Sequence, residues 1–204
     1  MTASRITNIL MAGVGGQGVL LASEVLALAA TYQGKEVKQT EVHGVAQRGG
    51  SVVSHVRYGD TVYSPVIRRG QADLVVAFEQ LEGLRYAHYL RPGGLLILNR
   101  ERIQPGQIGE KVPYPEGIEE YLAAKGFQVL PVPAAEVAIS LGNKRVSSMV
   151  LLGVTAHFLD LSGKAWEETL AGRIPARLLE INRQAFAAGQ QLAAAAPITL
   201  KPSA

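Results

Sequence analysis

A glycine-rich segment near the N-terminus is the first part of the chain with the residue types and spacing to bind a ligand. It reads Gly13-Val14-Gly15-Gly16-Gln17-Gly18, which matches the pattern G-x-G-x-x-G. It lies between an apolar run over residues 5–12 and a helical pattern over 19–32, the strand-turn-helix setting of a phosphate-binding loop. Its glycines would permit a tight turn, close approach of backbone N–H groups to a phosphate, and packing of helix on strand. The segment predicts an anion site; the alternative is a close strand-to-helix junction without a ligand.

A second polar segment, residues 39–51, ends in glycines and contains little apolar material. We therefore expect it on the surface, beside the first glycine loop. Arg48 could present a forked donor to a carboxylate or phosphate, and Gln39, Thr40 and Gln47 could add neutral hydrogen bonds. The alternative is a solvated loop in which Arg48 pairs with a neighbouring carboxylate.

A third polar glycine element, Gly142-Asn143-Lys144-Arg145, precedes a helical pattern over 146–161. Its backbone donors could receive an anion or a loop of a partner, or it is an ordinary helix start. The residues expected to bind a ligand are Gly13, Gly15, Gly16, Gln17, Gly18, Gln39, Thr40, Arg48, Gly49, Gly50 and Asn143. No catalytic residue and no metal ligand is predicted, because no nucleophile–base arrangement or metal-ligand spacing is found.

Glu41 raises an alternative function. A nicotinamide-binding domain needs an acidic residue at the end of its second strand, about 20 residues after the glycine loop. Glu41 has that place, but a polar loop follows it where a crossover helix should begin. A stand-alone nicotinamide or flavin enzyme therefore stays open, as does a non-catalytic adaptor of the same fold.

The elements that must position these segments alternate between strand and helix patterns. Strands are predicted over 5–12, 35–41, 51–58, 73–78, 94–98 and 127–131, and helices over 19–32, 80–89, 134–141, 146–161, 165–171 and 175–196. Continuous apolar runs such as 73–78 are typical of strands that are buried on both faces. The pattern predicts an α/β fold with a Rossmann-like, mostly parallel sheet and helices on both faces. We expect one domain over 1–196, with a helical C-terminal part over 145–196, and a disordered tail over 197–204.

Composition narrows the function classes. The 204 residues include no cysteine, which excludes disulfides, a thiol nucleophile and thiolate ligands for an iron–sulfur cluster. The net charge of +3 comes from scattered Lys and Arg, which argues against nucleic-acid binding. No apolar run approaches the roughly 20 residues of a membrane span, and the N-terminus does not resemble a signal peptide. The cytoplasm is the expected location.

The three polar segments, in this order, resemble the gamma domain of 2-oxoacid:ferredoxin oxidoreductases over about residues 5–160. A free-standing chain of this size is similar to the beta subunit of the indolepyruvate enzymes. One departure is Ser148 before Met149, where family members often have Asn. The resemblance implies a Rossmann-like small subunit that packs against a larger subunit carrying thiamine diphosphate and iron–sulfur clusters.

The resemblance also implies an activity for the whole complex. It would decarboxylate an aryl 2-oxoacid on thiamine diphosphate, pass electrons through the clusters to ferredoxin, and release an acyl-coenzyme A. The small chain would hold no cofactor alone and would be inactive in isolation. Its glycine loops would face the region of coenzyme A and thiamine diphosphate.

Overall fold

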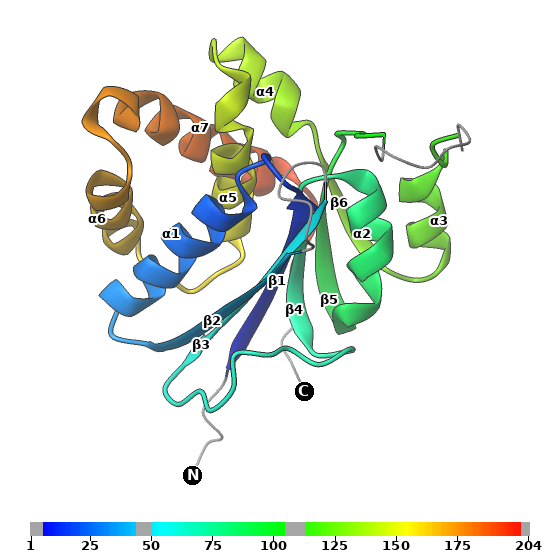
Figure 1. The fold of residues 1–204 in the computed structure, drawn as a ribbon, viewed down its shortest axis with the longest axis horizontal. Helices are drawn as coiled ribbons and strands as arrows, with labels where there is room; N and C mark the ends of the chain where they lie inside the picture. The colour runs from blue at the N-terminus through cyan, green and yellow to red at the C-terminus, as the bar shows by residue number, and fades with distance from the viewer. Residues whose placement is uncertain (1–5, 44–49, 105–112, 201–204) are drawn as a thin grey trace.

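The computed structural model describes residues 6–43, 50–104 and 113–200, and within them six strands form one sheet in the order β2-β3-β1-β4-β5-β6 (Figure 1). The strands are β1 (Thr7–Val14), β2 (Glu36–His43), β3 (Ser51–Gly59), β4 (Ala72–Ala77), β5 (Leu90–Asn99) and β6 (Gln128–Val132). The helices are α1 (Val19–Tyr32), α2 (Gln80–Tyr86), α3 (Ile118–Ala124), α4 (Ala134–Ser140), α5 (Ser147–His157), α6 (Gly163–Arg173) and α7 (Ala176–Ala195). The predicted α/β class is confirmed.

The sheet is mixed because β3 runs against its neighbours. β4 is parallel to β1, β5 to β4 and β6 to β5, whereas β3 is antiparallel to both β1 and β2. Residues 44–50 connect β2 to β3, and a parallel connection would need a crossover of about a dozen residues or more. The short connection therefore makes β3 antiparallel to β2, and the other edge of β3 pairs with β1.

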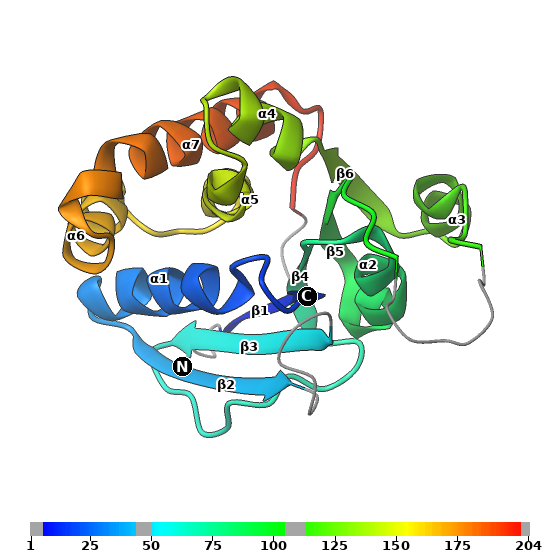
Figure 2. The same ribbon diagram turned by 45° about the horizontal axis from the view of Figure 1, so that its top comes forward.

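Helices cover both faces of the sheet (Figure 2). Along β1, Ile9 and Met11 enter the core beneath α1, α5 and α7, whereas Leu10 and Ala12 enter the core beneath α2 and α3. The helix after β1 therefore covers one face and the helix after β4 covers the other. β1 and β4 are neighbours, so the connections diverge between them, which is where open α/β sheets usually bind ligands.

Two segments add to the predicted elements. Helix α3 follows the Pro- and Gly-rich stretch after residue 104, where no helix was expected. Within the tail that the sequence predicts to be disordered, Ile198 and Leu200 pack against the larger core, and Gln128 donates to the carbonyl of Thr199 at 3.1 Å. Among the described residues, no helix is both long enough and apolar enough to cross a bilayer.

Helices α5 and α7 approach so closely that each needs a glycine at the crossing. A Cβ atom at Gly153 would lie 2.0 Å from the carbonyl oxygen of Phe186, and one at Gly189 would lie 2.0 Å from that of Val150. Both obstacles are backbone atoms, which cannot turn away as a flexible side chain can. The two glycines therefore set the distance between these helices.

We expect Gly153→Ala to lower the free energy of unfolding by about 2 kcal/mol or more, because the methyl group forces the helices apart. Gly172→Ala in α6 is the matched control, since an added Cβ there meets no atom within 4 Å. It should leave stability unchanged or raise it by about 0.5 kcal/mol. Urea unfolding followed by circular dichroism measures the free energy of unfolding of both variants. Equal changes in the two would contradict the idea that Gly153 is needed for the close approach of α5 and α7.

His55 is a buried titratable group on β3. It is 6% exposed, its Nδ1 accepts a hydrogen bond from the N–H of Ile67 at 3.2 Å, and its ring meets Tyr89 edge-on. Burial, with a smaller contribution from Arg57, lowers the pKa of His55. The folded state therefore favours the neutral ring, while the unfolded chain takes up a proton at its ordinary pKa of about 6.5.

The stability that depends on neutral His55 should be complete above about pH 6.5 and should fall as the pH drops below that value. In His55→Asn the side-chain oxygen can still accept from Ile67, so the free energy of unfolding should change less between pH 7 and pH 5. His157→Asn, at an exposed histidine of α5, should keep the wild-type dependence. If the free energy of unfolding changed equally with pH in wild type and His55→Asn, neutral His55 would not account for the pH dependence.

Candidate functional site

The side chain of Gln17, in the first glycine loop, is turned into the protein. Its Oε1 accepts from the N–H of Val14 at 2.7 Å, and its Nε2 donates to the carbonyl of Phe78 at 2.8 Å and to Glu101 Oε2 at 3.1 Å. Val14 ends β1, and Phe78 directly follows β4. One amide thus joins the carboxyl ends of the two strands between which the connections diverge.

Protein atoms are closely packed beneath the glycine loop at this point of the sheet. A Cβ at Gly13 would lie 2.7 Å from Val19 Cγ2, 2.8 Å from Phe78 Cβ and 2.9 Å from Gln17 Oε1. Gly13 is therefore required for close packing beneath the loop. Asn99 also donates to the carbonyl of Phe78, at 2.9 Å, and completes the polar contacts there.

The backbone N–H groups of the loop divide into two sets. Gly15 donates to the carbonyl of Gly50 at 2.9 Å, and Gln17 donates to that of Val14 at 3.1 Å, so both are used within the protein. In the part of the chain that the structure describes, the N–H groups of Gly16 and Gly18 have no acceptor. Both residues have positive φ, +103° and +82°. They directly precede α1, whose N-terminus favours negative charge.

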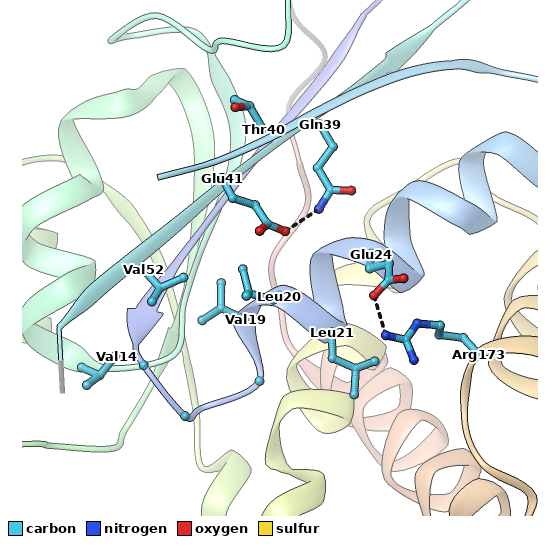
Figure 3. Close-up of a pocket in the computed structure, with 13 residues that line it drawn as sticks. Val14, Val19, Leu20, Leu21, Glu24, Gln39, Thr40, Glu41, Val52 and Arg173 are labelled. Carbon is cyan, nitrogen blue, oxygen red and sulfur yellow. Dashed lines mark hydrogen bonds and ion pairs between the residues drawn. The ribbon is translucent and has the colours of Figure 1, made fainter. Parts of the chain in front are cut away.

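A groove of about 1040 Å³ opens between this loop, α1, β2 and α6 (Figure 3). Its lining residues are Val14, Gly15, Gly16, Gly18, Val19, Leu20, Leu21, Glu24, Gln39, Thr40, Glu41, Val52 and Arg173. The groove is apolar beside the loop and polar toward β2. It therefore combines backbone donors at one end with an apolar wall, a combination typical of sites for amphipathic ligands.

Two polar contacts define the far side of the groove. Arg173 of α6 bonds Glu24 of α1 at 2.7 Å, and this bond lowers the pKa of Glu24. Gln39 Nε2 donates to Glu41 Oε1 at 3.2 Å and to Ser23 at 3.0 Å. Figure 3 shows the Glu41 side chain directed toward Leu20. Glu41 thus brings a carboxylate into the groove.

The predicted binding residues separate into three groups. Gly15, Gly16, Gly18, Gln39 and Thr40 line the groove, and Gly50 touches the loop through its carbonyl. Gly13 and Gln17 support the loop from inside. Arg48 and Gly49 lie outside the described residues.

The third polar glycine element, residues 142–145, leads directly into α5. Asn143 Oδ1 accepts from the N–H of Arg145 at 3.0 Å, so it caps the short helical turn before α5, and it is not among the residues that line the groove. Lys144 forms an ion pair with Glu101 at 2.8 Å. A Cβ at Gly18 would meet Ser148 Oγ at 2.9 Å, so the start of α5 lies directly against the glycine loop.

A buried acidic cluster, Glu79 and Glu82, lies on the other side of β1 from the groove. Glu79 accepts from Tyr114 and from the N–H of Glu82, and Glu82 accepts from Ser51 and Arg85. Burial is the main cause that raises the pKa of Glu82, and it also raises that of Tyr114. The cluster fixes the start of β3 against α2. Sequence patterns did not single it out, because surface acids near a helix start are common.

Comparison with known proteins identifies the family. The family described as pyruvate ferredoxin/flavodoxin oxidoreductase matches residues 8–192. The chain belongs to this family. The expected resemblance to its gamma domain is confirmed.

Relatives match over nearly the whole chain. A Pyrococcus horikoshii protein named indolepyruvate oxidoreductase subunit IorB is 36% identical, over 91% of this chain and 95% of its own. A protein of the same name from Archaeoglobus fulgidus is also 36% identical, over 97% and 98%. The gamma subunit of a keto/oxoacid ferredoxin oxidoreductase from Geobacter sulfurreducens PCA has a similar crystal structure, with TM-score 0.72, 27% identity and coverage of 93% and 99%.

Within this family fold, we expect Gln17→Glu to lower the free energy of unfolding by about 2 kcal/mol at pH 7, because a carboxylate cannot donate to Phe78 and would face Glu101. The change preserves side-chain size. Gln191→Glu, at an exposed position of α7, is the matched control and should have little effect. Urea unfolding of both variants tests this, and equal stabilities would show that the amide contacts contribute little.

Proposed function

We propose that this chain is the small subunit of an indolepyruvate:ferredoxin oxidoreductase, which converts an aryl 2-oxoacid to an acyl-coenzyme A. The observation that supports this best is the end-to-end match to subunits that bear the indolepyruvate name. Each chain covers more than nine-tenths of the other, so the similarity extends beyond a shared glycine loop. The glycine loop alone would be a weak basis, since folds host many functions.

The partner is a larger subunit that supplies thiamine diphosphate and iron–sulfur clusters, with ferredoxin as electron acceptor. The chain has no cysteine, so it has no thiolates for a cluster. No group of three or more His, Asp or Glu side chains suited to a metal occurs within residues 6–43, 50–104 and 113–200. The isolated chain is therefore expected to be inactive. The cytoplasmic location stays a prediction.

The groove is the proposed contribution of this chain to binding coenzyme A. The N–H groups of Gly16 and Gly18 and the start of α1 would bind an anionic group, and Val19, Leu20 and Val52 would contact an apolar part. Arg173 already neutralises Glu24. When bound, coenzyme A would supply the thiol that accepts the acyl group. The residues of this chain bind and orient, and none is assigned a proton-transfer step.

A stand-alone nicotinamide enzyme is favoured by one observation, the position of Glu41 in the groove. Two others count against it. β3 lies between β2 and β1, which puts Glu41 two strands, or roughly 10 Å, from the strand that leads to the glycine loop. The Gln17 side chain bonds both Val14 and Phe78 at the carboxyl ends of β1 and β4, where a dinucleotide usually lies.

The function is tested by purifying the chain with its natural partner and assaying reduction of a low-potential dye under anaerobic conditions. We expect reduction with indolepyruvate to require thiamine diphosphate, coenzyme A, the larger subunit and this chain, and to exceed reduction with pyruvate. Turnover of a nicotinamide or flavin nucleotide by the chain alone would instead establish the alternative.

The groove is tested by Leu20→Trp in the same complex. Leu20 is 41% exposed and lines the groove, so the larger ring should obstruct it and raise the KM for coenzyme A by about threefold or more. Leu28→Trp is the matched control: Leu28 is on the same helix, 42% exposed, and is not among the groove residues. Equal KM values for the two variants would place coenzyme A elsewhere.

A further inference from the structure

The side chain of Glu101 connects two of the polar elements. Its Oε2 accepts from Gln17 Nε2 at 3.1 Å, and its Oε1 pairs with Lys144 Nζ at 2.8 Å. Gln17 belongs to the first glycine loop and Lys144 to the element before α5. One carboxylate therefore contacts both elements, which are far apart in the sequence.

The position of Glu101 is fixed by its surroundings. It follows β5, and its own carbonyl accepts from the N–H of Gln80, at the start of α2, at 3.0 Å. Its side chain is 17% exposed, so the two contacts are shielded from much of the solvent. Charge-assisted hydrogen bonds are stronger and more directional in such places than on an open surface.

The contacts of Glu101 bear on the groove, although Glu101 does not line it. Gln17 sets the loop that carries Gly16 and Gly18, and Ser148 at the start of α5 lies against Gly18. A shift of residues 142–148 would therefore press on Gly18 or withdraw support from it. Glu101 resists such a shift because it holds Lys144 and Gln17 at one point.

We propose that Glu101 is a positioning residue, which fixes the glycine loop and residues 142–148 relative to each other and so keeps Gly16 and Gly18 in place to bind the ligand of the groove. The ligand itself, coenzyme A, rests on the proposed function. The positioning does not, and it can be measured in the chain without any ligand.

The test uses Glu101→Gln, which keeps the size of the side chain but cannot form the ion pair with Lys144. Lys144→Met removes the same ion pair from the exposed partner, which is 61% exposed, and is the second variant. The matched control is Glu119→Gln, because the Glu119–Arg100 pair has similar exposure, 20% and 53%, and lies outside the loop network. All three are compared with wild type.

The first measurement is hydrogen exchange of the backbone amides in the full chain. In Glu101→Gln and Lys144→Met, we expect exchange to rise about fivefold over both 13–18 and 142–148, with no change over β4 and α7. Glu119→Gln should leave both segments at the wild-type rate. Unchanged exchange in both segments, or a uniform rise along the chain, would overturn the proposal.

The second measurement is steady-state kinetics of the complex with its larger subunit. The KM for coenzyme A should rise about threefold in Glu101→Gln, while the KM for indolepyruvate stays at the wild-type value. Faster exchange in the two segments with an unchanged KM for coenzyme A would support the positioning and reject coenzyme A as the ligand. An equal rise of both KM values would overturn a local role for Glu101.

Discussion

The arrangement of the site depends on the amide of Gln17. An amide carries an acceptor and a donor, so this side chain can satisfy the N–H at the end of β1 and the carbonyl after β4 together. These two bonds tie the loop to the carboxyl ends of both strands. The groove of about 1040 Å³ lies on the other side of the loop, between the loop, α1 and β2.

Periodicity in the sequence was sufficient to predict the layers of the fold but not the direction of each strand. The apolar runs of β4 and β5 and the helical spacing of α1 come from burial, which leaves a clear residue pattern. Ser51–Gly59 alternates in the same way whichever direction the strand runs, so alternation could not reveal that β3 is antiparallel. The length of the connection over 44–50 carried that information. Helix α3 was not predicted because it is short and follows a Pro- and Gly-rich stretch.

The positions of the glycines could be predicted, whereas the role of each polar side chain could not. Strand-loop-helix context identified residues 13–18 as a loop, but the inward direction of Gln17 depends on Phe78 and Glu101, which are 61 and 84 residues away in the sequence. Asn143 was predicted to bind a ligand because it lies in a polar segment beside a glycine. In the structure it caps a helical turn instead of lining the groove. Local patterns report backbone conformation, and long-range contacts then determine which groups remain free to bind.

The charges of the groove constrain how an anionic ligand can lie in it. Glu24 is paired with Arg173, whereas Glu41 accepts only a neutral donor, Gln39, among the contacts described for it. An anion at the β2 end would therefore meet an unneutralised carboxylate, and an anion at the loop end would meet the N–H groups of Gly16 and Gly18. Electrostatics thus favours one orientation, with the anionic group at the loop and an uncharged part along Leu20 and Val52. In the proposed complex, this orientation would direct the uncharged part of coenzyme A away from the glycine loop.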